Sequence, residues 1–522
     1  MTNFPFLVGD AQHVARQAGK LIARDAFLGQ VAALAAHLPD QPHIVNLCVD
    51  RYHFTVTLAA AMLRGQVTLL PNSADARAVE ALRGEYPSLY VISDEARPEP
   101  CVSYPNLEGA TGGGMPTFPS EQIAAVLFTS GSTGRPTPSV RRWGRLVRAS
   151  QSAGAALGVD RFPGAAVVAT IPHAHSYGLE SAVMLALQHG LLLTSERPFF
   201  PADVAAAVAE GDQPGILITT PVHLRALVGG AEIQRLGFVL SATAPLSAEL
   251  AAAAEATFSA PVFEIYGCSE AGQLATRRTV RGPVWRCLAD FHLRQDSAGT
   301  WACGPDEDDV LLADEIELAS SGDFILQGRT ADMVNVAGKR SSLGFLTRQL
   351  LSIDGVLDGA FTMPANPSET ARLAAIVVAP GLDATTILAA LRRLIDPAFL
   401  PRPLHLVDTL PRNAVGKLPR EELLRLIAAT PVVIAFPADD PTGPGHFPGN
   451  PIIPGALLLN EVVASILPAG WRGEVEAAKF HHPVRPGDSV TVTSRNEDGK
   501  TRFECHITGS GQLVLSGTMS SA

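Results

Sequence analysis

Short apolar runs alternate with alanine-rich helical runs along the first three fifths of the chain. Eight of the apolar runs are rich in valine, isoleucine and leucine and short, which is typical of buried strands. Helical runs such as 54–64 and 202–210 lie between them. Strands that alternate with helices pair mostly in parallel, so the pattern predicts an α/β fold with largely parallel sheets. The eight runs are HIVNLCV, VTLLP, YVIS, AAVLFT, AAVVATIP, GILITTP, FVLSATAP and PVFEIYG.

The pattern changes around residues 328–340, where loop and turn residues replace the apolar runs. A smaller α/β unit follows, with AAIVVAP as a strand and 384–395 as a helix. The Pro/Gly-rich stretch 437–455 then precedes an apolar helix over 456–467 and three strand-like segments. This order predicts a large α/β domain over 1–331, a small α/β domain over 332–430 and an α+β domain over 431–522.

Composition and charge exclude several classes of protein. Hydrophobic residues make up 47% and charged residues only 17%, so the chain is predicted to bury large cores. The net charge of -11 argues against a nucleic-acid partner. Arg141, Arg142, Arg145 and Arg148 have near-helical spacing and are predicted to form a solvated helix face. The six cysteines are scattered and the apolar runs are too short to span a bilayer, so we expect a soluble, cytoplasmic protein.

The loop FTSGSTGRPTPS (128–139) carries the first candidate chemistry. Its glycines and hydroxyl residues suit a backbone that wraps a phosphate, although a surface turn is the plain alternative. The loop lacks Walker spacing, and no lysine follows it. The whole chain has only five lysines, and Lys417 lies in a glycine-flanked loop of the small domain. Lys417 is therefore the candidate for the missing positive charge.

Five further segments appear in a fixed order and together resemble the adenylate-forming enzymes, the family of acyl- and aryl-CoA ligases, luciferases and peptide-synthetase adenylation domains. The resemblance implies a large adenylation domain and a small mobile lid that carries Lys417 and turns on a hinge at Asp332. The segments are IPHAHSYGL (171–179), SATAPL (241–246), EIYGCSE (264–270), GRTADMVNVAGKR (328–340) and PRNAVGKLPR (411–420).

The resemblance also implies a role for individual residues. The phosphates of ATP would lie on Thr129, Ser130, Gly131, Ser132, Thr133 and Gly134. Adenine and ribose would be held by Thr243, Ala244, Pro245, Glu264, Tyr266, Gly267, Ser269, Asp314 and Arg329. Glu270 would bind Mg²⁺, a hard cation that prefers oxygen ligands, and His175 would lie beside the acyl pocket. Lys417 would bridge the substrate carboxylate and the α-phosphate.

Plain structural interpretations stay open for three of these residues. His175 could be a core histidine, Tyr266 could simply pack, and Asp314 is placed only by counting back through a loop. The chain also departs from the family pattern. Thr137, Pro138 and Ser139 replace the usual P-K-G, and Ala242 and Thr243 replace two glycines.

The last ninety residues resemble the hotdog-fold β-hydroxyacyl-carrier dehydratases, most closely those of aryl-polyene pathways, through GHFPGNPIIPGALLLNEV (445–462) and KFHHPVRPGDSVTV (479–492). His446 matches the catalytic histidine of that family. The acid position falls on Asn460, and Glu461 is one residue later, about 100° around a helix. The domain is therefore an active dehydratase, or a thioester-binding, thioesterase or dimerising module. Hotdog domains usually pair, so a homodimer is expected.

Together these features predict an ATP-dependent ligase that joins a small carboxylic acid, acyl or aryl, to a thiol through an acyl-adenylate. The thiol would be coenzyme A or the phosphopantetheine of an acyl carrier protein, in fatty-acid or aryl-polyene-like biosynthesis. One alternative is a 3-hydroxyacyl-thioester dehydratase with a degenerate ligase scaffold. Another is a non-catalytic nucleotide-binding scaffold.

Overall fold

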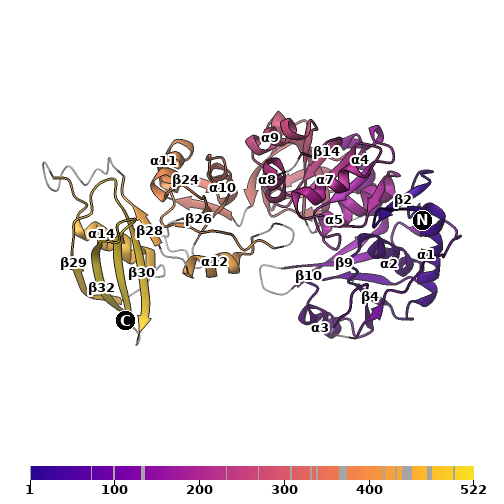
Figure 1. The fold of residues 1–522 in the computed structure, drawn as a ribbon, viewed down its shortest axis with the longest axis horizontal. Coiled ribbons are helices and arrows are strands. Elements are labelled where there is room, and N and C mark those ends of the chain that lie inside the picture. The colour runs from indigo at the N-terminus through magenta and orange to yellow at the C-terminus, as the bar shows by residue number, and fades with distance from the viewer. Residues whose placement is uncertain are drawn as a thin grey trace. The chain divides into compact units, whose positions relative to one another are not determined.

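The protein is described by a computed structural model, drawn as a ribbon in Figure 1. The described residues are 2–71, 73–97, 100–130, 136–230, 232–268, 270–305, 309–329, 332–336, 339–363, 373–413, 416, 418–429, 432–437, 450–466, 473–497 and 500–521. The chain forms two compact units. The first is Met1–Leu326 with Ala414–Gly416, and the second is Gln327–Asn413 with Lys417–Ala522.

The first unit contains a six-stranded sheet. Its strands are β4 (His43–Asn46), β5 (Val67–Leu70), β6 (Leu89–Ser93), β7 (Val102–Ser103), β9 (Ile123–Ser130) and β10 (Pro136–Arg142). They lie in the order β10-β9-β5-β4-β6-β7, and all neighbours pair in parallel except the antiparallel pair β9 and β10. The predicted phosphate loop lies between the two strands of that antiparallel pair.

An eleven-stranded sheet forms the rest of the framework of the first unit. Its strands are β2 (His13–Gln17), β3 (Lys20–Ala23), β11 (Ala166–Ala169), β12 (Leu192–Thr194), β13 (Gly215–Thr219), β14 (Leu236–Ser241), β15 (Val262–Cys268), β16 (Gly272–Arg278), β17 (Val284–Cys287), β21 (Asp314–Leu318) and β22 (Phe324–Arg329). The order is β21-β22-β17-β16-β15-β14-β13-β11-β12-β2-β3. The run from β2 to β15 in this order is parallel. The α/β class predicted from the sequence is confirmed.

Helices connect the parallel strands of both sheets. The longer ones are α1 (Arg24–His37), α2 (Arg51–Leu63), α3 (Ala76–Glu85), α4 (Trp143–Leu157), α7 (Pro201–Ala209), α8 (Pro221–Gly230) and α9 (Ala248–Phe258). Helix α2 begins where the Asp50 side chain accepts hydrogen bonds from the amides of Tyr52 and His53, which satisfies two donors at the start of the helix. Apolar residues on every side of α2 are buried, so this helix lies inside the unit.

The four arginines predicted to line a solvated helix face do not do so. Arg141 and Arg142 end strand β10, whereas Arg145 and Arg148 lie on helix α4, which begins at Trp143. Arg141 and Arg145 are buried, with 2% and 6% of their surfaces exposed. The guanidinium of Arg145 donates to the Ala271 carbonyl and lies over the ring of Phe291. The prediction was wrong because the helical spacing runs across a strand–helix junction.

The second unit is built on an eight-stranded sheet. Its strands are β25 (Asp358–Thr362), β26 (Ala374–Val378), β27 (Leu404–Leu406), β28 (Val432–Ala435), β29 (Gly473–Phe480), β30 (Ser489–Glu497), β31 (Lys500–Ile507) and β32 (Leu513–Ser521), and its helices are α10 (Leu343–Leu351), α11 (Ala384–Leu394), α12 (Arg420–Ala429) and α14 (Gly455–Ile466). The order is β25-β26-β27-β28-β30-β31-β32-β29. Figure 1 shows α14 against the yellow strands of the C-terminal part. Among the described residues, no helix combines the length and apolar content that crossing a bilayer requires.

Strand β28 is shared by the two predicted domains of the second unit. Val432 and Ile434 belong to the core that packs around α14, whereas Val433 and Ala435 pack against the core of the small α/β part. The strand pairs with β27 on one side and with β30 on the other. Because successive side chains of a strand point to opposite faces, one four-residue strand closes both cores.

The shared strand predicts that the small α/β part depends on the C-terminal part. Removal of residues 431–522 removes β28, the neighbour of β27 in the sheet. It also exposes to solvent the part of the small-domain core against which Val433 packs. We expect the remaining part of the second unit to lose about 2–4 kcal/mol of unfolding free energy through exposure of apolar surface, measured by denaturant unfolding.

A chain that ends at Pro437 is the matched comparison, because it keeps β28 and lacks only the rest of the C-terminal part. It should retain more stability in the small α/β part than a chain that ends at Thr430. Equal unfolding midpoints for the small part in the full-length protein and the chain ending at Thr430 would contradict a structural role for the strand.

Candidate active site

Four neighbouring parallel strands bring the predicted site segments to one edge of the large sheet. Of the predicted segments, 170–178 follows β11, 241–246 begins with the last residue of β14, and 266–268 ends β15. The end of β13 at Thr219, which the sequence did not single out, lies among them. These strands lie side by side as β11-β13-β14-β15, so their carboxyl ends meet along the same edge. Ligands of open α/β sheets bind outside the carboxyl ends of the strands. The edge is therefore the candidate site of the first unit.

Tyr266 and Asp314 come together at this edge although 48 positions separate them. The Tyr266 hydroxyl donates to Asp314 Oδ2 at 2.8 Å. Its ring packs against the stacked rings of Trp285 and Phe324, with centroids 5.7 Å from each. The structure thus places the acid predicted to accept from ribose hydroxyls beside the ring predicted to stack on adenine. Tyr266 also packs, so both roles that the sequence left open are compatible with its position.

Glu264 holds the SATAPL segment against the sheet. Its carboxylate is buried and accepts hydrogen bonds from the Leu246 amide at 3.3 Å, Arg277 Nε at 2.6 Å and Thr279 Oγ1 at 2.6 Å. Arg277 also lies over the ring of Trp285. These contacts tie the segment after β14 to strands β15 and β16. Glu264 therefore holds the SATAPL backbone in place at the predicted adenine site.

Thr243 adopts an unfavourable backbone conformation in the same segment. Its φ is +78°, in the left-handed region, where a β-branched residue is strained by clashes of its Cβ with the backbone. The family pattern has glycine here, which adopts this conformation without that penalty. Ala244 and Pro245 follow in the same turn before Leu246. The backbone turn expected from the pattern is therefore present despite the threonine.

Two glycines of the motifs are required by close backbone contacts. A Cβ on Gly178 would lie 1.9 Å from the Pro172 carbonyl oxygen, and a Cβ on Gly267 would lie 2.1 Å from the Gly272 carbonyl oxygen. Real Cβ atoms do not approach that closely, so both positions exclude any larger residue. The first contact closes the turn that presents His175.

The two histidines of the IPHAHSYGL segment have different environments. His173 is buried, and its Nε2 lies 2.9 Å from the Cys48 carbonyl, to which the neutral ring donates. Burial, together with the nearby Arg51 guanidinium, lowers the pKa of His173 to about 3. His175 is partly exposed at the start of the short helix α5 (Ser176–Gly178). His173 is thus the core histidine, and His175 is the one accessible to a ligand.

Glu270 is exposed in the turn after β15. Beside it, burial raises the pKa of the Cys268 thiol to about 11, so this residue stays uncharged. Within the described ranges, no group of three or more histidine, cysteine or acidic side chains is arranged to hold a metal. Mg²⁺ usually takes one or two carboxylates and completes its shell with waters and phosphates. One exposed carboxylate, such as that of Glu270, fits that donor set.

Other predicted residues are placed only in part. Thr129 and Ser130 end β9 and Arg329 ends β22, and only their backbones are described. The remaining predicted residues lie outside the described part of the chain: Gly131, Ser132, Thr133, Gly134, Ser269, Lys417 and His446.

In the second unit, Asn460 is exposed on α14 while the next residue, Glu461, is buried. The Glu461 carboxylate lies 3.7 Å from a guanidinium nitrogen of Arg402, which comes from the small α/β part. Consecutive helix residues point about 100° apart, so the Asn460 amide lies at the surface while the Glu461 carboxylate points inward.

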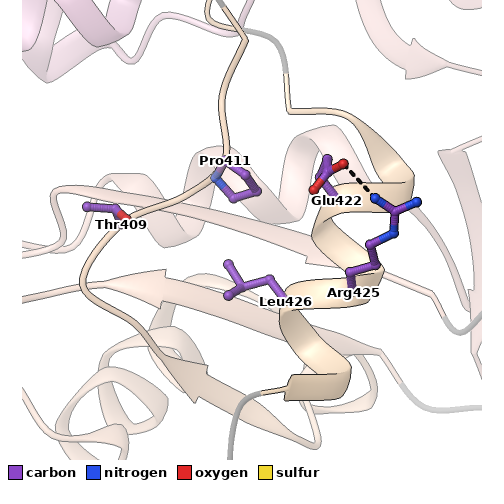
Figure 2. A pocket seen from close by; sticks show the side chains of 5 residues that line it. All are labelled: Thr409, Pro411, Glu422, Arg425 and Leu426. Atoms are coloured by element: carbon purple, nitrogen blue, oxygen red, sulfur yellow. Dashed lines mark hydrogen bonds and ion pairs between the residues drawn. The ribbon is translucent and has the colours of Figure 1, made fainter.

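A cavity of about 340 Å³ lies in the second unit, between α12 and the segment that leads to Lys417 (Figure 2). Figure 2 shows Glu422 and Arg425 on one side, joined by an ion pair of 2.9 Å. Its lining includes none of the predicted nucleotide or acyl residues, so we regard it as a surface hollow. The lining residues are Thr409, Pro411, Glu422, Arg425 and Leu426.

Sequence reasoning also missed two residues at the sheet edge, Glu180 and Gln273. Glu180 accepts a hydrogen bond from the Gln273 amide at 2.9 Å, and it lies next to the buried Arg141. Glu180 follows the recognised histidine segment directly, but no motif or spacing marks it. An acidic residue in an otherwise apolar run, LESAVMLAL, was the only signal in the sequence.

Comparisons with known proteins cover both units. A family model described as AMP-binding enzyme matches residues 39–300, and a model described as ApeI dehydratase matches residues 430–518. A 4-coumarate–CoA ligase from Rhodobacter capsulatus is 30% identical over 238 residues, which cover 45% of this chain and 60% of that relative. The chain thus aligns with about three fifths of that relative's length.

A second relative matches the C-terminal part. A 3-hydroxyacyl-[acyl-carrier-protein] dehydratase FabZ from Ehrlichia chaffeensis is 34% identical over 82 residues, or 13% of this chain and 57% of that protein. Among solved structures, o-succinylbenzoate CoA synthetase from Bacillus subtilis, in complex with its acyl-adenylate, superposes with a TM-score of 0.69. It covers 81% of this chain and 98% of its own at 16% identity, which establishes likeness of fold alone.

The strain at Thr243 predicts that glycine stabilises this position. Thr243→Gly should raise the unfolding free energy by about 1 kcal/mol, because the left-handed conformation costs a β-branched residue ~1–3 kcal/mol and part of the gain is offset by chain entropy. Thr243→Ala is the control, since it keeps the Cβ and should give no comparable gain. Equal stability of the two variants in denaturant titrations would show that φ is not the source of strain.

Burial of His173 predicts part of the acid sensitivity of the fold. Its folded pKa of about 3 lies below the ordinary value of 6.5, so between these values the unfolded chain binds a proton that the folded chain does not. Stability should therefore fall as the pH drops through this window. His173→Asn should flatten that fall by up to ~1.4 kcal/mol per pH unit, measured by urea unfolding between pH 7 and 4.

The exposed His37 provides the comparison. His37→Asn should leave the pH slope as in the unmodified protein. If His173→Asn keeps the full slope as well, the buried ring is not the group responsible.

Proposed function

Because the chain belongs to the AMP-binding enzyme family and ends in an ApeI-dehydratase-like domain, we propose that it is an ATP-dependent acid–thiol ligase whose thioester is bound or processed by its own C-terminal domain. The observation that carries this proposal is the bond between Tyr266 and Asp314 at the sheet edge. It joins two separate motif residues, predicted for adenine and ribose, at the place where α/β folds bind ligands.

In the proposed first step, a carboxylate oxygen attacks the α-phosphorus of ATP. The new C–O–P linkage forms as the bond to pyrophosphate breaks. Both partners are anions, so alignment and charge neutralisation are the main tasks of the protein. Lys417 would supply one positive charge and the amides of the loop after Ser130 would hold the phosphates. Mg²⁺, which Glu270 would hold, would screen the phosphate charge when bound.

In the proposed second step, a thiol attacks the acyl carbon of the adenylate. The thioester forms, AMP leaves, and the thiol proton passes to solvent. The thiol belongs to coenzyme A or to a carrier-protein phosphopantetheine. The 4-coumarate–CoA ligase relative acts on an acid with an aromatic ring, which supports an aryl acid as the first substrate class to test. An aryl-polyene-like pathway would use such an acid as a primer.

The C-terminal domain supports a second candidate activity. The ApeI dehydratase match covers His446, the predicted base for removing the α-proton of a 3-hydroxyacyl thioester. The exposed Asn460 in place of an acid instead favours a binding or thioesterase role. The edge strand β29 exposes Ala477, Ala478 and Phe480, and such an edge suits pairing with a second copy of the chain.

Acid-dependent ATP–pyrophosphate exchange tests the ligase. We expect exchange with one class among fatty, 3-hydroxy and aromatic acids, and a decrease on the order of 10²–10³-fold in Lys417→Ala through loss of transition-state charge stabilisation. Lys500→Ala is the matched control, because Lys500 is an exposed lysine paired with Glu476 on the C-terminal sheet. It should keep full exchange.

A parallel assay separates the alternatives. Nucleotide binding without exchange for any acid would favour the scaffold, and hydration or dehydration of a 3-hydroxyacyl thioester without exchange would favour a pure dehydratase. Either result would overturn the ligase. Product assays with coenzyme A and with a carrier protein then identify the thiol.

A further inference from the structure

Two opposite charges are buried together inside the first unit. Arg141 on strand β10 is 2% exposed and Glu180 is 3% exposed, and Arg141 Nε lies 3.5 Å from Glu180 Oε1. Removing charges from water is costly unless further hydrogen bonds compensate. A pair of this kind contributes little net stability to a fold, so its local contacts indicate what it does.

Glu180 joins the histidine segment to the turn that carries Glu270. Glu180 Oε1 accepts from Ser176 Oγ at 2.6 Å, and Ser176 directly follows His175. Glu180 Oε2 accepts from the backbone amide of Gln273 at 2.9 Å. One carboxylate thus links the segment of the predicted acyl-pocket histidine to Gln273 in β16, three residues after the predicted metal ligand.

Arg141 adds the strand that returns from the phosphate loop. Its guanidinium donates to Ser139 Oγ at 2.9 Å and to Ser176 Oγ at 3.3 Å. Strand β10 pairs with β9 from Pro136 opposite Ser130 onwards, so the loop lies at the end of this hairpin. Ser176 therefore receives contacts from both members of the pair, and the hairpin is tied to the histidine segment.

The local backbone is adapted to this arrangement. Glu180 lies in a π-helical turn, Leu179–Met184, and such turns are rare and often found at functional sites. Gly272 has a φ of +68°, and a Cβ there would lie 3.0 Å from Glu180 Oε2. The glycine lets the carboxylate reach the Gln273 amide. Gln273 Nε2 also donates to the buried Ser181 hydroxyl at 2.6 Å.

We propose that Arg141 and Glu180 are positioning residues of the ligase reaction. They hold the phosphate-loop hairpin, the His175 segment and the Glu270 turn at fixed separations, so that groups on three segments meet the same two anionic substrates. The inference rests on the proposed function. It assigns no substrate contact to either residue.

The test separates positioning from simple structural support. Glu180→Ala and Arg141→Met should each lower the kcat of exchange at least ~10-fold, because misplaced groups lose alignment. The double variant Arg141→Met/Glu180→Met removes both charges and keeps the volume filled. Its melting temperature should return to within about 4 °C of the original, whereas its kcat should stay low because the bonds to Ser176 and the Gln273 amide are still missing.

Glu255→Gln is the matched control. Glu255 forms a partly buried bidentate pair with Arg278 at 2.6 and 2.8 Å and accepts from the Val262 amide, at the first residue of β15 and not at its carboxyl end. The variant should melt earlier but keep its kcat per folded molecule. If the double Met variant regains kcat together with stability, or if Glu180→Ala behaves like Glu255→Gln, the pair is structural only and the proposal fails.

A measurement that does not depend on catalytic activity tests this proposal independently of the ligase assignment. Hydrogen exchange of the peptide that spans 270–276, followed by mass spectrometry in the full-length protein, should accelerate in Glu180→Ala and not in Glu255→Gln. If no acid supports exchange in the unmodified protein, the ligase assignment fails, and this measurement still decides whether the carboxylate orders the turn. Unchanged protection in Glu180→Ala would overturn the proposed anchoring.

Discussion

Parallel pairing of β11, β13, β14 and β15 is the constraint on which the rest of the first unit depends. It brings four loops to one sheet edge and leaves their backbone groups without strand partners. Backbone groups at such an edge need compensating bonds from elsewhere. In this protein part of the compensation comes from buried charged side chains near the candidate site, and the Tyr177 hydroxyl adds bonds to the Thr219 and Leu240 carbonyls.

Three buried side chains illustrate the principle. Glu264 anchors the segment after β14 through the Leu246 amide, and Glu180 anchors the start of β16 through the Gln273 amide. The fully buried guanidinium of Arg51 donates to the carbonyls of Thr194 at 2.7 Å and Ala169 at 3.0 Å, at the ends of β12 and β11. In each case the charged side chain forms hydrogen bonds with backbone groups. Removing the side chain would therefore also free the backbone segment that it holds.

The second unit is organised by a different constraint. Strand β28 alternates between two cores, so the small α/β part and the C-terminal part share a continuous sheet. A hydrogen bond of 2.7 Å between Thr385 on α11 and Ser489 on β30 adds a side-chain link. If Lys417 swings as the family resemblance implies, the dehydratase-like part would move with it. The shared sheet makes these two parts one compact unit and not two tethered domains.

The sequence alone determined the α/β class, the largely parallel pairing and the segments that carry the family motifs, because short apolar runs and glycine-rich motifs are local signals. Tertiary structure alone decided that Arg141 is buried beside Glu180, that Tyr266 bonds to Asp314, and that Val433 serves a core outside its own predicted domain. Each of these depends on residues distant in sequence or on a junction between elements. The periodicity of apolar residues in the sequence predicts which side chains are buried. Long-range strand pairing decides which other residues those side chains contact in the core.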